Sequence, residues 1–173
     1  MTSIHWRRCD YRIESLKITV LGLEESVQQL RKKLDKSEWY DGFWLLEELE
    51  PIYGLMFIAL QNYINSSIYD RFESLDKQYL KYRIGNQIKE TGRTDIELII
   101  SIANYYKHRD YPGDFKKETL KILVDFNLQF DKEGDIKDSP IFKALEMFSE
   151  NWDTNLLIKA VEVWREKLWT IIE

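Results

Sequence analysis

Apolar residues recur at intervals of three and four along most of the chain, which is the spacing expected of amphipathic α-helices. The clearest case is residues 13–34, where Gln, Arg and Lys residues cover the side opposite a single apolar stripe. The stripe consists of Ile13, Leu16, Val20, Leu23, Val27, Leu30 and Leu34. Asp10 precedes the pattern and is a candidate N-cap. The pattern therefore predicts a helix over this segment.

Residues 51–73 are apolar on most sides, which is typical of a helix at the centre of a bundle. The apolar positions are Ile52, Leu55, Met56, Phe57, Ile58, Ala59 and Leu60. Pro51 has no amide hydrogen, so the sequence predicts that one helix ends near Glu50 and that another begins at Pro51. We expect the other helices to pack around residues 51–73.

The next helices are placed by local start and stop signals. Residues 76–89 fit a shorter helix. Thr94 followed by Glu97 matches the capping box, in which the two residues cap each other's backbone amides. The helix that they open is expected to run to about His108, because Pro112–Gly113 interrupts the pattern soon afterwards.

Further signals of the same kind divide the last third of the chain. Helical spacing returns over residues 115–129 and is followed by a polar loop over 131–138. Ser139–Pro140 is a typical cap and first residue of a helix, here extending to about Ser149. Asp153 or Thr154 is expected to cap the last helix.

These elements predict an all-α fold. The chain of 173 residues fits one domain, over residues 1–173, with six to eight helices around the central apolar helix at about 51–73. Only 7 Gly and 3 Pro are available for the tight turns that an all-β fold needs, and no segment is a convincing strand.

Charge and cysteine content narrow the class of protein. The net charge of -5 argues against a broad surface for binding nucleic acid, although a local basic pocket remains compatible with it. The single Cys9 cannot form an internal disulfide, and the first residues lack the apolar core of a signal peptide. The apolar stretch 54–60 is too short to cross a bilayer. We expect a cytoplasmic protein that does not enter a membrane.

Several kinds of catalytic site can be set aside. Two histidines and one cysteine cannot assemble a closed zinc site, and no phosphate-binding or dinucleotide-binding glycine loop is present. His108-Arg109-Asp110 matches the kinase catalytic loop in these letters alone, because Phe115 stands where that loop needs Asn. The acidic runs, Glu24–Glu25 and Glu47–Glu48 with Glu50, are expected on solvated helix faces. We predict no metal and no cofactor.

One polar stripe is a candidate site. On a helical wheel of residues 94–108, Glu97, Ser101, Asn104 and His108 fall opposite a buried arc of Ile96, Ile99, Ile102, Ala103 and Tyr106. His108 is a candidate catalytic acid or base, and Asn104 is a candidate for orienting a substrate. Lys107 and Arg109 are candidates for binding phosphate. The alternative is a solvated helix end, where positive side chains favour the helix dipole.

The stretch ANYYKH over residues 103–108 resembles the R-N-x-x-x-H signature of HEPN (higher eukaryotes and prokaryotes nucleotide-binding) domains. Asn104 and His108 match the Asn and His of that signature. The resemblance implies an all-α bundle, often dimeric, in a family that includes many metal-independent ribonucleases. Ala103 occupies the position of the family's Arg, which argues against nuclease activity.

Two functions follow as expectations. The first is HEPN-like processing of RNA or a nucleotide bound in a local pocket. The second is a non-catalytic interaction module of the immunity, antitoxin or adaptor type, acting as a homodimer or with a partner protein. Aromatic residues suit the second function, because large aromatics often anchor interfaces. They are Trp39, Tyr40, Phe43, Trp44, Trp164 and Trp169.

Overall fold

The computed structural model of the chain describes residues 6–36, 40–111, 115–128 and 134–170. Helices dominate these residues, which confirms the all-α prediction. They are α1 (Ile13–Leu34), α2 (Gly42–Phe72), α3 (Gln78–Tyr82), α4 (Asp95–His108), α5 (Lys117–Asp125), α6 (Pro140–Phe148) and α7 (Thr154–Thr170). Short 3-10 turns form at Trp6–Arg8 and Ile136–Asp138. No helix in the described part of the chain is long and apolar enough to span a membrane.

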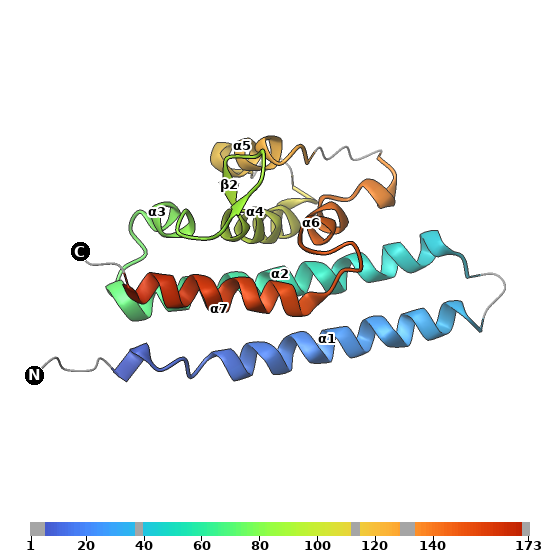
Figure 1. Cartoon of the computed structure of the whole chain (residues 1–173). Helices are drawn as coiled ribbons and strands as arrows, with labels where there is room; N and C mark the ends of the chain where they lie inside the picture. Colours follow the sequence, from blue (N-terminus) through green and yellow to red (C-terminus); the bar gives the residue numbers. More distant parts are fainter. Residues whose placement is uncertain (1–5, 37–39, 112–114, 129–133, 171–173) are drawn as a thin grey trace, which may run out of the picture.

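The helices are arranged in layers around α2 (Figure 1). Helices α1 and α2 run side by side as a long hairpin, and α7 lies along the same layer. Helices α4 and α6 pack on the other side of α2, with α5 outermost. Apolar side chains of α1, α2, α4, α6 and α7 meet in one buried cluster. The expectation of a central apolar helix is met by α2, which buries residues along its whole length.

Pro51 lies inside α2 and does not begin a new helix, so the predicted break at Glu50 was wrong. The helix starts at Gly42, where the Asp41 side chain accepts hydrogen bonds from the amides of Phe43 and Trp44. A proline within a helix removes one backbone hydrogen bond and crowds the preceding turn. Here both sides of the proline are held by buried residues, including Leu49 and Tyr53, and packing outweighs that local cost.

The start of α1 also differs from the prediction. Its N-cap residue is Arg12, and no side chain caps it. Asp10 serves a tertiary contact: it accepts a hydrogen bond from the Tyr63 hydroxyl and lies 3.6 Å from Nε of the buried Arg165. The carboxylate therefore fastens the N-terminal segment to α2 and α7.

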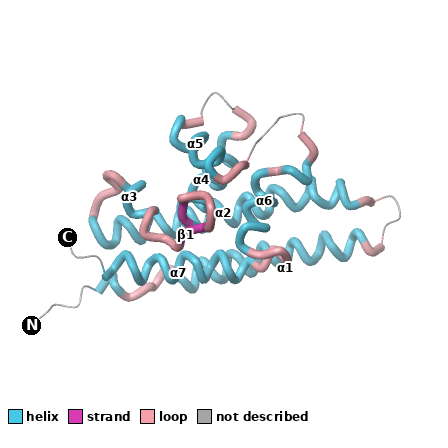
Figure 2. Tube along the Cα trace, turned by 45° about the horizontal axis from the view of Figure 1, so that its top comes forward, coloured by secondary structure: helices cyan, strands magenta, loops and turns pink. Residues whose placement is uncertain are grey.

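The predicted helix over 76–89 shrinks to α3 and a two-stranded hairpin, β1 (Gln87–Ile88) and β2 (Arg93–Thr94). Figure 2 shows that, among the described residues, strand geometry is confined to this hairpin. Gly92, in the turn between β1 and β2, takes a φ of +67°, a backbone conformation that favours glycine. Gly85 passes so close to α4 that a Cβ atom there would lie 2.3 Å from Oδ1 of Asp95.

The other boundaries follow their local signals closely. The Ser139 side chain accepts from the amide of Ile141 at the start of α6, and Asp153 accepts from the amide of Asn155 at the start of α7. Helix α5 is shorter than the predicted 115–129. Pro112–Gly113 and residues 131–133 of the predicted loop lie outside the described residues.

Candidate functional site

The polar stripe of α4 is buried over the first half of the helix. Glu97 is 3 % exposed and Ser101 1 % exposed, so these two residues of the stripe are not solvated, whereas Asn104 and His108 are half-buried. The Ser101 hydroxyl donates to the carbonyl oxygen of Leu98. Helices α5, α6 and α7 pack against α4, and the β1–β2 hairpin leads directly into it.

The first turn of α4 is a fully paired polar network. Thr94 and Glu97 form the predicted capping box, with the Thr94 hydroxyl accepting from the Glu97 amide. The Arg93 guanidinium donates to Glu97 at 2.8 Å and lies 2.7 Å from Asp125 of α5. Since these buried charges neutralise one another, this end of the helix has a structural role.

Asn104 and Lys107 are joined through Gln61 of α2. Gln61 is 6 % exposed; its amide nitrogen donates to Oδ1 of Asn104 at 2.9 Å, and its amide oxygen accepts from the Lys107 ammonium. This contact fixes which way the Asn104 amide faces, because its oxygen is already engaged. Within the described chain no hydrogen bond engages the Asn104 amide nitrogen, which is left as a donor.

Lys107 is placed where its charge is not fully compensated. Burial lowers the pKa of the Lys107 ammonium, and the positive charge of nearby Lys116 lowers it further. An ammonium in this position gains from any anion that binds beside it, since the anion offsets both effects.

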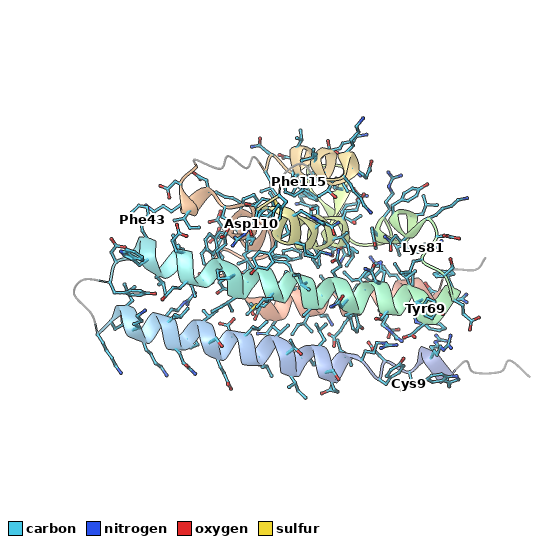
Figure 3. All side chains as sticks on the ribbon, turned by 180° about the vertical axis from the view of Figure 1, so that it is seen from behind. Cys9, Phe43, Tyr69, Lys81, Asp110 and Phe115 are labelled. Atoms are coloured by element: carbon cyan, nitrogen blue, oxygen red, sulfur yellow. The ribbon has the colours of Figure 1, made fainter. Side chains whose placement is uncertain are left out.

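His108 lies one turn beyond Asn104, at the last residue of α4. Its ring meets Phe115 edge-on at 6.4 Å between centroids, and Phe115 stacks on Tyr105 at 6.1 Å. Phe115, just before α5, and Asp110, just after α4, are labelled in Figure 3. The imidazole is half-buried, and no hydrogen bond within the described chain engages its nitrogens. Aromatic contact orients the ring and leaves its nitrogens available for proton transfer.

Arg109 is directed away from this group. It forms an ion pair with Glu50 of α2, which also accepts a hydrogen bond from the Ser139 hydroxyl at 2.5 Å. A cavity of about 1020 Å³ adjoins the pair. Its charged lining residues are Glu47, Glu50, Asp110, Asp135, Asp138, Glu146, Arg109 and Lys143. The acidic excess of this lining disfavours a phosphate group, and the Arg109 guanidinium, which the sequence predicted to bind phosphate, is paired with Glu50.

Ala103 occupies the core. Its side chain is 0 % exposed, so the position that carries Arg in the resembling family faces the interior here. Close to it, α2 and α4 approach so tightly that a Cβ atom at Gly54 would lie 2.4 Å from the Tyr106 ring. An arginine at position 103 would have no route to solvent in this packing.

The acidic runs take part in polar contacts of the fold. Glu48 accepts hydrogen bonds from Lys33 and the Tyr40 hydroxyl, and Tyr40 lies at 4.2 Å beneath the Lys33 ammonium. Glu24 accepts from Gln28 on its own helix. The described residues contain no group of three or more His, Cys, Asp or Glu side chains that could hold a metal ion.

The aromatic residues divide between core and surface. Tyr40 and Trp164 are 3 % and 0 % exposed, and the Trp164 indole donates to the carbonyl oxygen of Lys81. Phe43 and Trp44 are 48 % and 60 % exposed at the start of α2. Trp39 lies outside the described residues. The exposed pair is thus the part of the aromatic set that is open to a partner.

Gln61 is the site residue that the sequence did not indicate. It lies 43 positions from Asn104, inside the most apolar stretch of the chain. An amide among apolar residues of a buried helix is a usable signal, because a buried polar group requires a partner. The identity of that partner depends on the packing of α2 against α4.

No family model matches the sequence, and comparisons with curated proteins and with solved structures give no match either. The assignment of function therefore depends on the geometry of the site.

Proposed function

We propose that the protein binds a phosphate group of RNA or of a nucleotide at the end of α4, and that His108 performs acid–base chemistry on bound RNA. The observation that supports this proposal is the hydrogen-bonded series Asn104–Gln61–Lys107, one turn from a half-buried histidine. The series sets an amide donor and an ammonium in fixed positions before any ligand arrives. Preorganised donors of this kind bind oxyanions well.

The charges support a phosphate ligand over an uncharged one. Lys107 and Lys116 are close enough for each to oppose the charge of the other, and a phosphate would offset that repulsion. The basic area is small and belongs to a chain of net charge -5. Binding would therefore involve a few phosphates and weaken only gradually as salt is added.

His108 supplies the chemical step in this proposal. Its imidazole accepts the proton of a ribose 2′-hydroxyl as that oxygen attacks the adjacent phosphorus. The bond from phosphorus to the 5′-oxygen breaks, and the departing oxygen takes a proton from water. The hydroxide that remains takes the proton held by His108, which returns the imidazole to its neutral form. The products are a 2′,3′-cyclic phosphate and a 5′-hydroxyl. DNA lacks the 2′-hydroxyl and should remain intact.

The test is cleavage of a short single-stranded RNA by the purified chain in the presence of a metal chelator. The native chain should cleave the RNA, and the cleavage rate of His108→Ala should be about 100-fold or more lower, as expected when a general acid–base group is removed. His5→Ala, which replaces the other histidine, should cleave normally. Cleavage that persists in His108→Ala, or that DNA undergoes equally well, contradicts the proposal.

A second candidate is a non-catalytic interaction module of the immunity, antitoxin or adaptor type. It is favoured by Ala103 in the core, by Arg109 engaged with Glu50, and by the exposed pair Phe43 and Trp44. In that case the native chain should cleave no RNA. Trp44→Ala should instead abolish recovery of a specific partner protein, while Trp6→Ala, at a similar exposure of 66 %, should not.

A further inference from the structure

Helix α2 has an exposed side without charge. No charged residue occurs from position 51 to 69, in a chain that is 32% charged. Yet Leu55 is 47 % exposed and Tyr69 52 % exposed, and Asn62 between them is exposed as well. This side of α2 faces the viewer in Figure 3, where Tyr69 is labelled. Solvated helix faces normally carry charges, whereas the centres of protein interfaces are depleted of them.

Helix α1 continues this surface. A shallow groove of about 450 Å³ runs between the two helices. It is lined by Tyr11, Arg12, Ser15, Leu16, Thr19, Ala59, Asn62, Tyr63 and Ser66. Ile18, which precedes the groove residue Thr19 in the chain, is 69 % exposed. We refer to the groove together with Leu55, Tyr69 and Ile18 as the α1–α2 face.

No contact within the described chain explains why a glycine occupies position 22 of α1. It lies in the middle of a 22-residue helix, and a Cβ atom added to it would meet nothing within 4 Å. A glycine inside a helix costs about 1 kcal/mol relative to alanine. No neighbour within the described part of this fold requires a residue without a side chain at position 22. Close approach of another molecule to α1 would require one.

We propose that the α1–α2 face binds a second copy of the chain about a two-fold axis, with the two α2 helices crossing antiparallel at Ala59. Two copies of a chain with a net charge of -5 repel each other over most of their surfaces. On this face the α2 segment 51–69 carries no charge, and Arg12 in the groove is paired with Asp70. In a two-fold interface the same patch must complement itself. Leu55 projects about 6 Å along α2 from Ala59, and the groove at Asn62 and Tyr63 opens at a similar distance on the other side.

The α1–α2 face is large enough for a stable dimer interface. Nineteen residues of α2 at 1.5 Å each give about 28 Å of length, and two helices of about 10 Å give about 20 Å of width. The product is about 600 Å² per protomer, or about 1,200 Å² in total. Stable protein interfaces begin at about that total area. The dimer should therefore form at micromolar concentrations and dissociate on dilution.

Sedimentation equilibrium of the full chain tests the proposal. The native chain should be dimeric, and Leu55→Arg should be monomeric because it sets a charge in the groove of the partner. Leu156→Arg is the matched control, since Leu156 lies on α7 at a similar exposure of 42 %. Circular dichroism should show that both variants fold. A native chain that stays monomeric, or a dimer lost equally in Leu156→Arg, overturns the proposal.

The crossing at Ala59 has its own test. It sets Leu55 of one protomer opposite Asn62 of its partner, so opposite charges at these positions should attract. Leu55→Arg and Asn62→Asp should each dimerise poorly alone and should form a heterodimer when mixed. A mixture that remains monomeric overturns the proposed crossing. These outcomes do not depend on whether the protein binds RNA.

Discussion

The two ends of α4 use similar side chains for different purposes. At the N-terminal end, the charges of Arg93, Glu97 and Asp125 are paired at 2.7–2.8 Å, and Arg93 and Glu97 are buried. At the C-terminal end, Lys107 has an amide partner and a positive neighbour, and His108 has an aromatic one. One end is electrostatically complete, and the other is where we propose that an anion binds.

This difference separates a structural polar network from a site. Completed ion pairs stabilise a fold only while both partners remain, because a lone buried charge is costly. Hydrogen-bond donors without acceptors contribute little to the stability of the fold and cost little free energy at the surface. They form strong hydrogen bonds when a charged ligand binds. Substitutions at the two ends should therefore affect different measurements.

The largest expected effect lies between the two ends, at Ala103. Ala103→Arg would force a long charged side chain into a position that is 0 % exposed. Overpacking and an unpaired buried charge together should lower the free energy of unfolding by about 5 kcal/mol. Denaturation by urea measures the change. Val124→Arg, at a position 70 % exposed on α5, should change it by less than about 0.5 kcal/mol.

A somewhat smaller loss is expected at the N-terminal end. Arg93→Ala leaves Glu97 buried without its main partner and should cost about 3–5 kcal/mol of unfolding free energy. Arg83→Ala is the matched control, because Arg83 also approaches Glu97, at 3.7 Å, but its side chain is 55 % exposed. Its loss should be about 0–1 kcal/mol. Equal losses in the two variants would show that burial does not distinguish them.

The smallest effect on stability is expected at the C-terminal end, where it should depend on pH. Because the pKa of Lys107 is lowered in the folded chain, the unfolded chain holds more protons between that pKa and the ordinary 10.5. The contribution of Lys107 to stability should therefore rise with pH in this window. Subtracting the unfolding free energy of Lys107→Met from that of the native chain at each pH isolates it. A difference that falls with pH would contradict the lowered pKa.

Local signals in the sequence predicted much of this fold. The capping box at Thr94 and Glu97 and the Ser139–Pro140 pair each specify a helix start through contacts within one turn. Contacts within one turn form independently of the tertiary packing around them. The periodicity of residues 13–34 likewise gave α1 at the same bounds, because its stripe faces one side of the bundle.

Features that depend on distant residues were not predictable in the same way. From the sequence alone, Pro51 predicts a helix break. The packing of Leu49 and Tyr53 on either side of it, which keeps α2 continuous, is visible only in the structure. Glu97 and Ser101 lie opposite the apolar arc of the helix, yet both are buried, and Arg93, which pairs with Glu97, also bonds Asp125, 32 positions further along the chain. At the candidate site, the sequence grouped Arg109 with Lys107, but residues two apart project about 200° apart on a helix.

The central claim is that the C-terminal end of α4 binds phosphate. An NMR titration of the native chain with a short single-stranded RNA that carries 2′-deoxyribose at the cleavage position tests it most directly. The resonances of the His108 ring, the Asn104 side-chain amide and the Lys107 ammonium should shift together. Those of Arg93 and Thr94 at the other end should stay in place. Shifts confined to other parts of the chain, or none at all, would contradict the claim.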